Sequence, residues 1–178
     1  MPLKPGSPET EGKDGYGGDG DMEAQVRVRG ANSNDLPQLA RLFDSYRVFY
    51  GQASDPTAAE RFVCDRLSEG DSHIFVAHPQ FSPDRLLGFT QLYPSYSSVL
   101  MRRIYILNDL FVEPTTRRAG VGRALIAAVH EFAKEQGAAW VSLETAVTNS
   151  AAQRLYESLG YQRDSSFVHY HWQVPAAA

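Results

Sequence analysis

One stretch of the sequence restricts the fold more than any other. It joins a strand-like run to a long amphipathic helix and covers residues 108–132, NDLFVEPTTRRAGVGRALIAAVHEF. An apolar run ends at a proline, a basic turn follows, and apolar residues then recur at helical spacing. Arg117, Arg118 and Arg123 stand at the start of this helix, where the aligned peptide dipoles already leave partial positive charge. Positive side chains at the positive end of a helix predict that an anion binds there.

The two glycines of the turn favour a phosphate site. Gly120 and Gly122 have no Cβ atom, so the backbone N–H groups of residues 118–124 can approach phosphate oxygens at the helix N-terminus. The common phosphate motifs do not match. The turn lacks the Gly-Lys-Ser/Thr of a P-loop, and Leu125 stands where a dinucleotide fingerprint needs a third small residue. An ordinary glycine turn with solvated arginines is the alternative interpretation.

The net charge of −4 is concentrated at the N-terminus. Residues 1–23 hold two Lys against six Asp or Glu, whereas residues 24–178 hold fifteen basic and fifteen acidic residues. The first segment is rich in Gly and Pro, so we expect a disordered acidic segment over residues 1–24 and one folded domain over residues 25–178. Because the folded part has no basic excess, no nucleic-acid partner is expected.

Several features of the sequence bear on the compartment. It has no apolar run near the ~18 residues of a membrane-spanning helix, and its first twenty residues lack the apolar stretch of a signal peptide. Cys64 is the only cysteine, so no disulfide forms within the chain. We therefore expect a cytoplasmic protein without a membrane partner.

Hydrophobic periodicity predicts alternating strands and helices. The predicted strands cover residues 25–29, 72–78, 86–93, 102–112, 139–145 and 167–174. The predicted helices cover residues 34–51, 55–70, 121–137 and 149–160, with Asn34 or Asp35 capping the first and Asp55 the second. Three successive strands separated by polar loops predict an antiparallel meander. The fold class is thus α/β (α+β), a mixed, mostly antiparallel sheet with helices on both faces.

Two motifs resemble those of a known family. The run from Val112 to Gly122, VEPTTRRAGVG, resembles the acyl-CoA-binding signature Arg/Gln-x-x-Gly-x-Gly/Ala of the GNAT N-acetyltransferases. The second hallmark, NSAAQRLYESLGY from Asn149 to Tyr161, follows after a helix and a strand. The resemblance covers residues 25–173, and the run ILNDLFVEP makes the chain look closest to the polyamine- and histone-type amine acetyltransferases of that family.

The resemblance implies the GNAT acyl-CoA N-acyltransferase fold. In that fold the strands 103–112 and 139–145 splay apart, and acetyl-CoA lies in the opening. Backbone groups near residues 110–112 would pair with the pantetheine arm, and residues 117–124 would hold the pyrophosphate. The residues expected to contact acetyl-CoA are Leu110, Phe111, Val112, Arg117, Arg118, Ala119, Gly120, Val121, Gly122, Arg123, Ala124, Asn149, Ala152 and Tyr156.

The implied reaction is acetyl transfer from acetyl-CoA to a primary amine by direct attack on the thioester. Tyr156 shares one helix face with Asn149 and Ala152, and a neutral phenol near the thioester sulfur can protonate the departing thiolate. Packing in the core is the alternative role of Tyr156. A non-catalytic acyl-CoA-binding or regulatory module of the same fold is the alternative function.

The acceptor requires a base, because an alkylammonium has a pKa near 10.4 and must lose a proton before it attacks. Asp109 and Glu144 are the candidate bases, since they lie on the two diverging strands, and water is a third. Asn108 departs from the pattern of the polyamine enzymes, which commonly carry a glutamate at this place. A structural carboxylate that accepts backbone hydrogen bonds is the alternative role of Asp109.

The remaining candidates concern the acceptor pocket and assembly. Five aromatic residues near the ends of predicted elements are candidates for the pocket wall: Tyr46, Phe49, Tyr50, Tyr93 and Tyr96. His169 and His171 alternate on the last predicted strand without a third ligand, so no metal site is expected. That strand, FVHYHWQV, would form an aromatic-rich exposed edge, which favours association. We therefore expect a homodimer.

Overall fold

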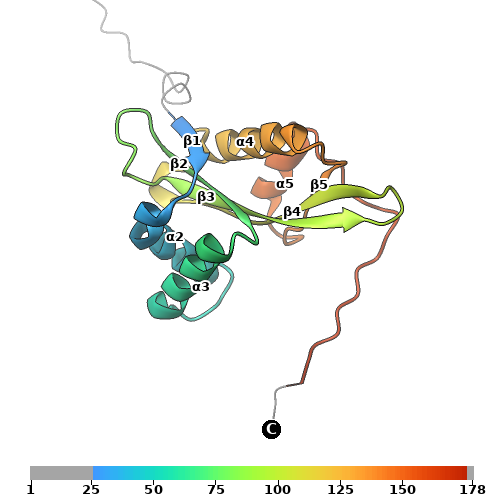
Figure 1. The fold of residues 1–178 in the computed structure, drawn as a ribbon, viewed down its shortest axis with the longest axis horizontal. Helices are drawn as coiled ribbons and strands as arrows, with labels where there is room; N and C mark the ends of the chain where they lie inside the picture. Colours follow the sequence, from blue (N-terminus) through green and yellow to red (C-terminus); the bar gives the residue numbers. More distant parts are fainter. Residues whose placement is uncertain (1–25, 176–178) are drawn as a thin grey trace, which may run out of the picture.

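The computed structural model describes residues 26–175, so the acidic segment expected to be disordered lies outside the described residues. Five strands form one sheet in the order β1-β2-β3-β4-β5 (Figure 1). β1 to β4 pair antiparallel, and β5 pairs parallel with β4. The strands are β1 (Val26–Gly30), β2 (His73–Pro79), β3 (Gly88–Ser97), β4 (Arg102–Val112) and β5 (Val141–Leu143).

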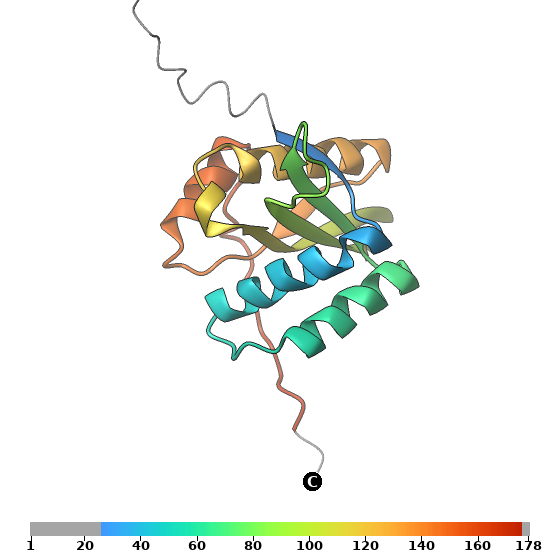
Figure 2. The same cartoon turned by 90° about the vertical axis from the view of Figure 1, so that its left-hand side faces the viewer.

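Helices lie on both faces of the sheet (Figure 2). α2 (Leu36–Phe49) and α3 (Pro56–Glu69) lie side by side on one face. α4 (Val121–Glu135) lies on the other, with α5 (Ser150–Ser158) beside it. The predicted mixed sheet with helices on both faces is therefore confirmed. Two short 3₁₀ turns precede α2 and α4, namely η1 (Ser33–Asp35) and η2 (Pro114–Thr116).

Each face of the sheet buries its own apolar cluster. Leu39 and Phe43 of α2 pack with α3 on one side, and Leu125 of α4 packs on the other. These residues recur at helical spacing, and burying such a side chain stabilises the fold by about 1.5–3 kcal/mol. Asp55 caps α3 as predicted, because its carboxylate accepts a hydrogen bond from the N–H of Ala58 at 3.0 Å.

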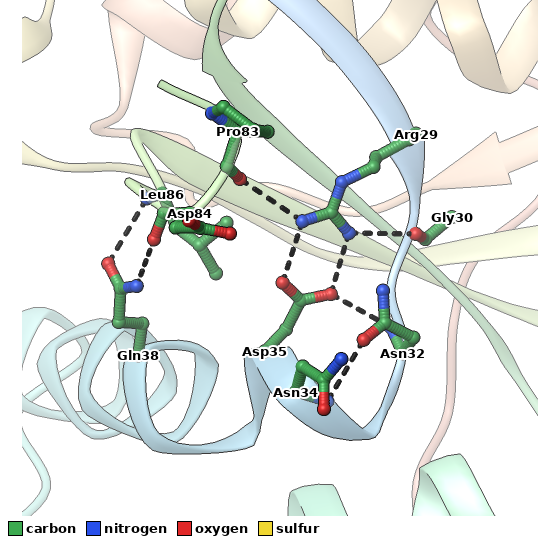
Figure 3. Close-up of polar contacts among 9 residues, drawn as sticks. All are labelled: Arg29, Gly30, Asn32, Asn34, Asp35, Gln38, Pro83, Asp84 and Leu86. Atoms are coloured by element: carbon green, nitrogen blue, oxygen red, sulfur yellow. Dashed lines mark hydrogen bonds and ion pairs between the residues drawn. The ribbon is translucent and has the colours of Figure 1, made fainter.

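The start of the first helix differs from the prediction. Neither Asn34 nor Asp35 caps α2 through its side chain; Asn32 instead caps η1, its Oδ1 accepting from the N–H of Asn34 at 2.9 Å. The Asp35 carboxylate accepts from both terminal guanidinium nitrogens of Arg29 at 2.7 and 2.8 Å (Figure 3). The N–H of Asn32 also donates to it at 2.8 Å. The prediction was wrong because an ion pair with β1 engages this carboxylate.

Hydrogen bonds from Arg29 and Gln38 also hold the loop between β2 and β3. Arg29 donates to the carbonyl oxygen of Pro83 at 3.2 Å. The side-chain amide of Gln38 donates to the carbonyl of Asp84 and accepts from the N–H of Leu86 (Figure 3). The N-terminus of α2 is therefore tied both to β1 and to this loop.

The C-terminal part of the chain also differs from the prediction. Residues 167–174 form no strand, and beyond the contact of His169 with Glu144 the chain runs away from the domain (Figure 1). β5 is shorter than the predicted 139–145, and no strand among residues 26–175 lies beyond it. Both predictions were wrong for one reason. An alternating pattern describes a strand-like sequence, but a strand forms only where backbone partners lie within reach.

Candidate functional site

The sheet opens between β4 and β5. The two strands pair only over Tyr105–Leu107 and Val141–Leu143, so residues 108–112 of β4 have no strand partner on that side within the described chain. β4 stays paired with β3 along the same stretch. The opening is the splay that the family resemblance implies, and its rim carries backbone groups available to a ligand.

A β-bulge lies where the two strands separate. Gln91 of β3 faces Asp109, whereas its neighbour Leu92 faces Leu107, so Asn108 is an extra residue on β4. Bulges re-aim side chains. Here Asn108 is exposed, whereas Asp109 is buried with 4% of its surface exposed.

The side chain of Asn108 hydrogen-bonds the buried Asp109 carboxylate. Nδ2 of Asn108 lies 3.3 Å from each carboxylate oxygen, and Tyr46, whose hydroxyl donates to the backbone carbonyl oxygen of Asn108, lies beside the same group. Burial raises the pKa of Asp109, and the neighbouring side chains of Tyr46 and Asn108 oppose that shift. A carboxylate with a raised pKa accepts a proton more readily, as a general base must.

Tyr46 links this carboxylate to a group of aromatic rings. Its hydroxyl lies 3.4 Å from the carbonyl oxygen of Asn108, and its ring packs edge-on against Tyr50 at 5.0 Å. Burial, and then the charge of Asp109, raises the pKa of Tyr46, so its phenol stays protonated. Sequence reasoning identified Tyr46 only as a wall residue. No sequence signal could have found its contact with Asp109, because α2 and β4 meet only in the fold.

The other predicted wall residues are spread more widely. Phe49 packs against Tyr50 with ring centroids 5.2 Å apart. On β3, the hydroxyl of Tyr93 accepts from Gln91 at 3.0 Å. The hydroxyl of Tyr96 accepts from an arginine of β4 at 3.0 Å. The structure thus groups the three aromatics of the α2 end and leaves Tyr96 on the β3–β4 hairpin.

Tyr156 is buried on α5 and lines a groove beside β5. Burial, and then the neighbouring Tyr50 and Tyr161, raises the pKa of Tyr156 to about 12, so its phenol is protonated at neutral pH. The groove has a volume of about 1340 Å³, and Asn108 and Glu144 line it as well. The predicted acid and one of the predicted bases therefore share a groove.

Glu144 and Asp109 sit in different surroundings. Glu144 follows β5, is exposed, and has its Oε1 3.3 Å from Nδ1 of His169. Asp109 is buried beside the bulge. Glu144 is exposed to water, whereas burial raises the pKa of Asp109.

No side chain of the described residues caps the N-terminus of α4. Gly120 occupies the cap position with a φ of 75°, which favours glycine. The backbone N–H groups of the first turn are therefore placed to meet an anion. Gly122 has a packing role, because a Cβ there would lie 3.2 Å from Cδ2 of Leu155, and the Leu155 side chain would have to shift to make room for it.

The three arginines surround this helix start in different ways. The guanidinium of Arg117 lies 5.5 Å from the ring centroid of Phe49. Arg118 is exposed and has a φ of 67°, which residues other than glycine rarely adopt. Arg123 donates to Oγ of Ser158 on α5 at 3.0 Å. The turn thus holds all three charges near the uncapped helix, with Arg123 directed toward α5.

The remaining predicted contact residues differ in what they can offer a ligand. Phe111 and Val121 are buried in the core, so only their backbone groups can face acetyl-CoA. Asn149 lies before α5, not on its face, and its Oδ1 accepts from the N–H of Ala152 at 3.2 Å. This cap uses the amide oxygen alone. The other predicted residues are half-buried: Leu110, Val112, Ala119, Ala124 and Ala152.

Residues 26–175 contain neither a cluster of metal-ligating side chains nor a membrane-spanning helix. No group of three or more His, Cys, Asp or Glu side chains in this range is arranged to hold a metal ion. None of the helices in the described part combines the length and apolarity needed to cross a membrane.

Comparison with known proteins identifies the fold. The model of the acetyltransferase (GNAT) family matches residues 38–161. The uncharacterized N-acetyltransferase YhfO of Bacillus subtilis (strain 168) is 46% identical over 85% of this chain and 99% of its own length. The thialysine N-epsilon-acetyltransferase of Bos taurus is 31% identical over 78% of this chain and 85% of its own length. A crystal structure of a probable acetyltransferase has a TM-score of 0.79 at 38% identity, covering 85% of this chain and 99% of that one.

These matches agree with the splayed sheet and with both sequence motifs. The chain therefore belongs to the GNAT family of acetyltransferases and is an acyltransferase with the fold of that family.

Proposed function

We propose that the enzyme transfers an acetyl group from acetyl-CoA to a primary amine. The observation that carries the proposal is the pair of buried groups at the opening of the sheet. Tyr156 keeps its proton at neutral pH, and burial raises the pKa of Asp109. One group can give a proton and the other can take one, which is what acylation of an alkylammonium by a thioester requires.

The uncapped start of α4 supports acetyl-CoA as the donor. In the proposal, the backbone N–H groups of residues 117–124 hold the pyrophosphate, and Arg117 and Arg118 add positive charge. The free rim of β4 at residues 110–112 pairs with the amides of the pantetheine arm, as a further strand would. The amide nitrogen of Asn149, which the cap does not use, donates to the same arm.

The proposed reaction removes two protons from the acceptor nitrogen and gives one proton to the departing sulfur. Asp109, directly or through a water molecule, takes a proton from the alkylammonium. The neutral amine attacks the thioester carbonyl carbon, and the tetrahedral intermediate collapses as its carbon–sulfur bond breaks. Tyr156 gives its hydroxyl proton to the departing thiolate, and the second proton that the attacking nitrogen loses passes through water to the Tyr156 oxygen. Asp109 releases its proton to solvent, so a neutral amide and a free thiol leave the site. Glu144, which lines the groove from the β5 side, is the second candidate for the base.

The proposed acceptor is a small alkylamine or a lysine-type amine. The negative charge of Asp109 and the rings of Tyr46 and Tyr50 suit an ammonium group, because aromatic faces attract cations. The Bos taurus relative is named for transfer to an N-epsilon amine, which supports this acceptor class. With a single cysteine, the proposal also places the enzyme in the reducing cytoplasm, and fractionation of the cells that produce it tests this placement.

The test is an assay of free-thiol release from acetyl-CoA with a panel of polyamines, lysine analogues and peptides. We expect turnover with at least one amine and a loss of kcat on the order of 100-fold in Tyr156→Phe. Tyr105→Phe is the matched control, since it removes the hydroxyl of another buried tyrosine, in the core of β4. Binding of acetyl-CoA without transfer to any amine would instead support a non-catalytic module.

A further inference from the structure

The last turn of α2 carries three aromatic rings that lie between the arginine turn and the proposed acid and base. Phe49 and Tyr50 follow Tyr46 by three and four residues, so all three side chains leave the helix on the same side. Phe49 and Tyr50 are 54% and 47% exposed, although both rings are large and mostly apolar. Large apolar side chains that gather at a surface indicate a place where a ligand binds.

Phe49 contacts the turn that leads into α4. Cζ of Arg117 lies 5.5 Å from the ring centroid of Phe49 and 5.8 Å from that of Phe111. Nε of Arg117 donates to the carbonyl oxygen of Val112 at 3.3 Å, which leaves the two outer guanidinium nitrogens for a ligand. Two rings and one carbonyl therefore hold this guanidinium, three residues before the uncapped start of α4 at Gly120.

Tyr50 connects Phe49 to the proposed acid and base. Its ring packs against Phe49 at 5.2 Å and against Tyr46 at 5.0 Å, edge to face in both pairs. Tyr50 also neighbours Tyr156 of α5, and Tyr46 lies beside Asp109. The rings thus form a continuous series of contacts from the arginine turn to the two groups that the proposed reaction uses.

The backbone around these rings is held in place. The Asp44 carboxylate accepts from Oγ of Ser54 at 2.6 Å and from the N–H of Asp55 at 2.8 Å, so α2 fixes the start of α3. The N–H of Gln52 donates to the carbonyl oxygen of Arg47 at 3.0 Å. A ligand at the arginine turn therefore acts on the side chains of the last turn of α2 more easily than on the loop that follows it.

We propose that Phe49 is a positioning residue that couples the coenzyme site to the acceptor site. Coenzyme phosphates that engage Arg117 hold its guanidinium against Phe49, and Phe49 then holds Tyr50 against the acceptor amine. Phe49 itself touches no reacting atom. The inference rests on the proposed function, because it takes acetyl-CoA as the donor and an amine as the acceptor.

The weakest contact in the series limits the size of the coupling. An exposed contact between a guanidinium and a ring changes an equilibrium constant by roughly two- to fivefold. Each substrate should strengthen the binding of the other by the same factor, since coupling between binding sites is reciprocal. Phe49→Leu should therefore raise KM for both substrates by roughly two- to fivefold and change kcat by less than about twofold. A residue that only lined the acceptor pocket would change KM for the amine alone.

The first experiment titrates the full chain with coenzyme A in a calorimeter. We expect Phe49→Leu to raise Kd roughly two- to fivefold and Arg117→Gln to raise it roughly tenfold. The double variant should match Arg117→Gln, because Phe49 acts through the guanidinium. Phe81→Leu is the matched control, since Phe81 is 84% exposed but lies in the loop between β2 and β3. Wild-type affinity in Phe49→Leu, or losses that add in the double variant, would overturn the proposal.

The second experiment follows Tyr50 without an acceptor. The full chain is labelled with 3-fluorotyrosine, and the ¹⁹F resonance of Tyr50 is identified by its absence from Tyr50→Phe. The probe is ADP, which carries a pyrophosphate but no pantetheine arm, so a response of Tyr50 has to pass through the protein. At saturating ADP we expect the resonance to shift in the wild type and in Phe81→Leu, but not in Phe49→Leu. A resonance that ADP leaves unmoved in the wild type, or moves equally in Phe49→Leu, overturns the proposal.

The outcomes separate the coupling from the proposed function. If ADP shifts Tyr50 only when Phe49 is present, but no amine is acetylated, the proposed function fails while the coupling stands. If an amine is acetylated and Phe49→Leu leaves KM for acetyl-CoA unchanged, the proposed function stands and the coupling fails. A chain that binds neither coenzyme A nor ADP would refute both.

Discussion

β1 and β5 are the two edge strands of the sheet, and they differ in how the rest of the chain contacts them. β1 carries Arg27 and Arg29, and Arg29 is held by Asp35 and by the loop between β2 and β3. β5 has only three residues, and the groove that Tyr156 lines lies beside it. Charged side chains protect a sheet edge from pairing. The chain's own side chains and a loop thus hold the β1 edge, whereas the β5 side is open to solvent. The candidate catalytic residues lie on this open side.

This difference between the two edges predicts that one edge affects the stability of the fold and the other affects activity. Changes at the β1 edge should lower the free energy of unfolding and leave catalysis intact. Changes at the β5 side should lower turnover or coenzyme affinity and leave the fold intact. Four predictions test this separation, in order of decreasing effect.

The largest effect is expected on the open side from Asp109→Asn. Removing the proposed base should lower kcat/KM on the order of 100- to 1000-fold at neutral pH, or about 3–4 kcal/mol. In the wild type, kcat/KM should rise as the pH rises through the pKa of Asp109, which lies above 3.8, because only the carboxylate takes a proton. The variant should lack this limb of the pH profile.

The same variant, Asp109→Asn, should lose activity but keep or gain stability against unfolding. Because burial raises the pKa of Asp109, its ionisation at neutral pH disfavours the fold. Asp109→Asn should therefore unfold at an equal or higher urea concentration than the wild type. A large loss of stability would assign Asp109 a structural role and remove it from the proposed mechanism.

The next effect concerns the start of α4. Gly122→Leu should raise the Kd for coenzyme A by roughly 30-fold, or about 2 kcal/mol, because the new side chain meets Leu155 and separates α4 from α5. Titration calorimetry measures this affinity. Gly30→Leu on the β1 edge is the matched control, since a Cβ there meets no atom within 4 Å. Equal affinity in the two variants would speak against an anion site at this turn.

The closed edge is tested by Asp35→Asn. The variant loses the charge that holds Arg29 and should unfold with about 1–2 kcal/mol less free energy, which lowers Tm by roughly 2–8 °C. Turnover should match the wild type within a factor of two or so, because the edge lies outside the opening. If Asp35→Asn lost most of its turnover but kept the stability of the wild type, the claim that the β1 edge affects only stability would be wrong.

The smallest effect is the acid response of this ion pair. Burial alone would raise the pKa of Asp35, but the hydrogen bonds from Arg29 and Asn32 outweigh it and lower the pKa below 3.8. A depressed carboxylate pKa contributes stability above the unfolded value and loses it as the pH falls through the folded value. Wild type and Asp35→Asn should therefore converge in stability as the pH falls below about 3.8. Curves that stay parallel down to acid pH would exclude this linkage.

Much of the fold follows from local patterns in the sequence. The alternating runs in residues 73–97, the stripe of α4 and the cap at Asp55 each describe structure within a few residues of themselves. The predictions failed where distant groups compete. Asp35 is engaged by Arg29 of β1, and residues 167–174 have the pattern of a strand but no partner in their own chain.

The candidate site divides in the same way. The sequence identified Tyr156, Asp109 and the turn at residues 117–124 through motifs, whose residues are close together in the chain. It did not indicate the bulge that buries Asp109 and exposes Asn108, or the position of Tyr46 beside the carboxylate. These depend on the register between strands and on the packing of α2 against β4.

By itself, then, the sequence determined the family, the order of helices and strands, and the types of residue available for acid–base chemistry. The tertiary structure alone decided which carboxylate is buried, which edge of the sheet is closed, and where the C-terminal segment finds no partner. The physical reason is the separation along the chain of the residues that interact. Backbone preference and side-chain periodicity act between near neighbours in the chain, whereas burial, hydrogen-bond partners and pKa depend on residues that only the folded chain brings together.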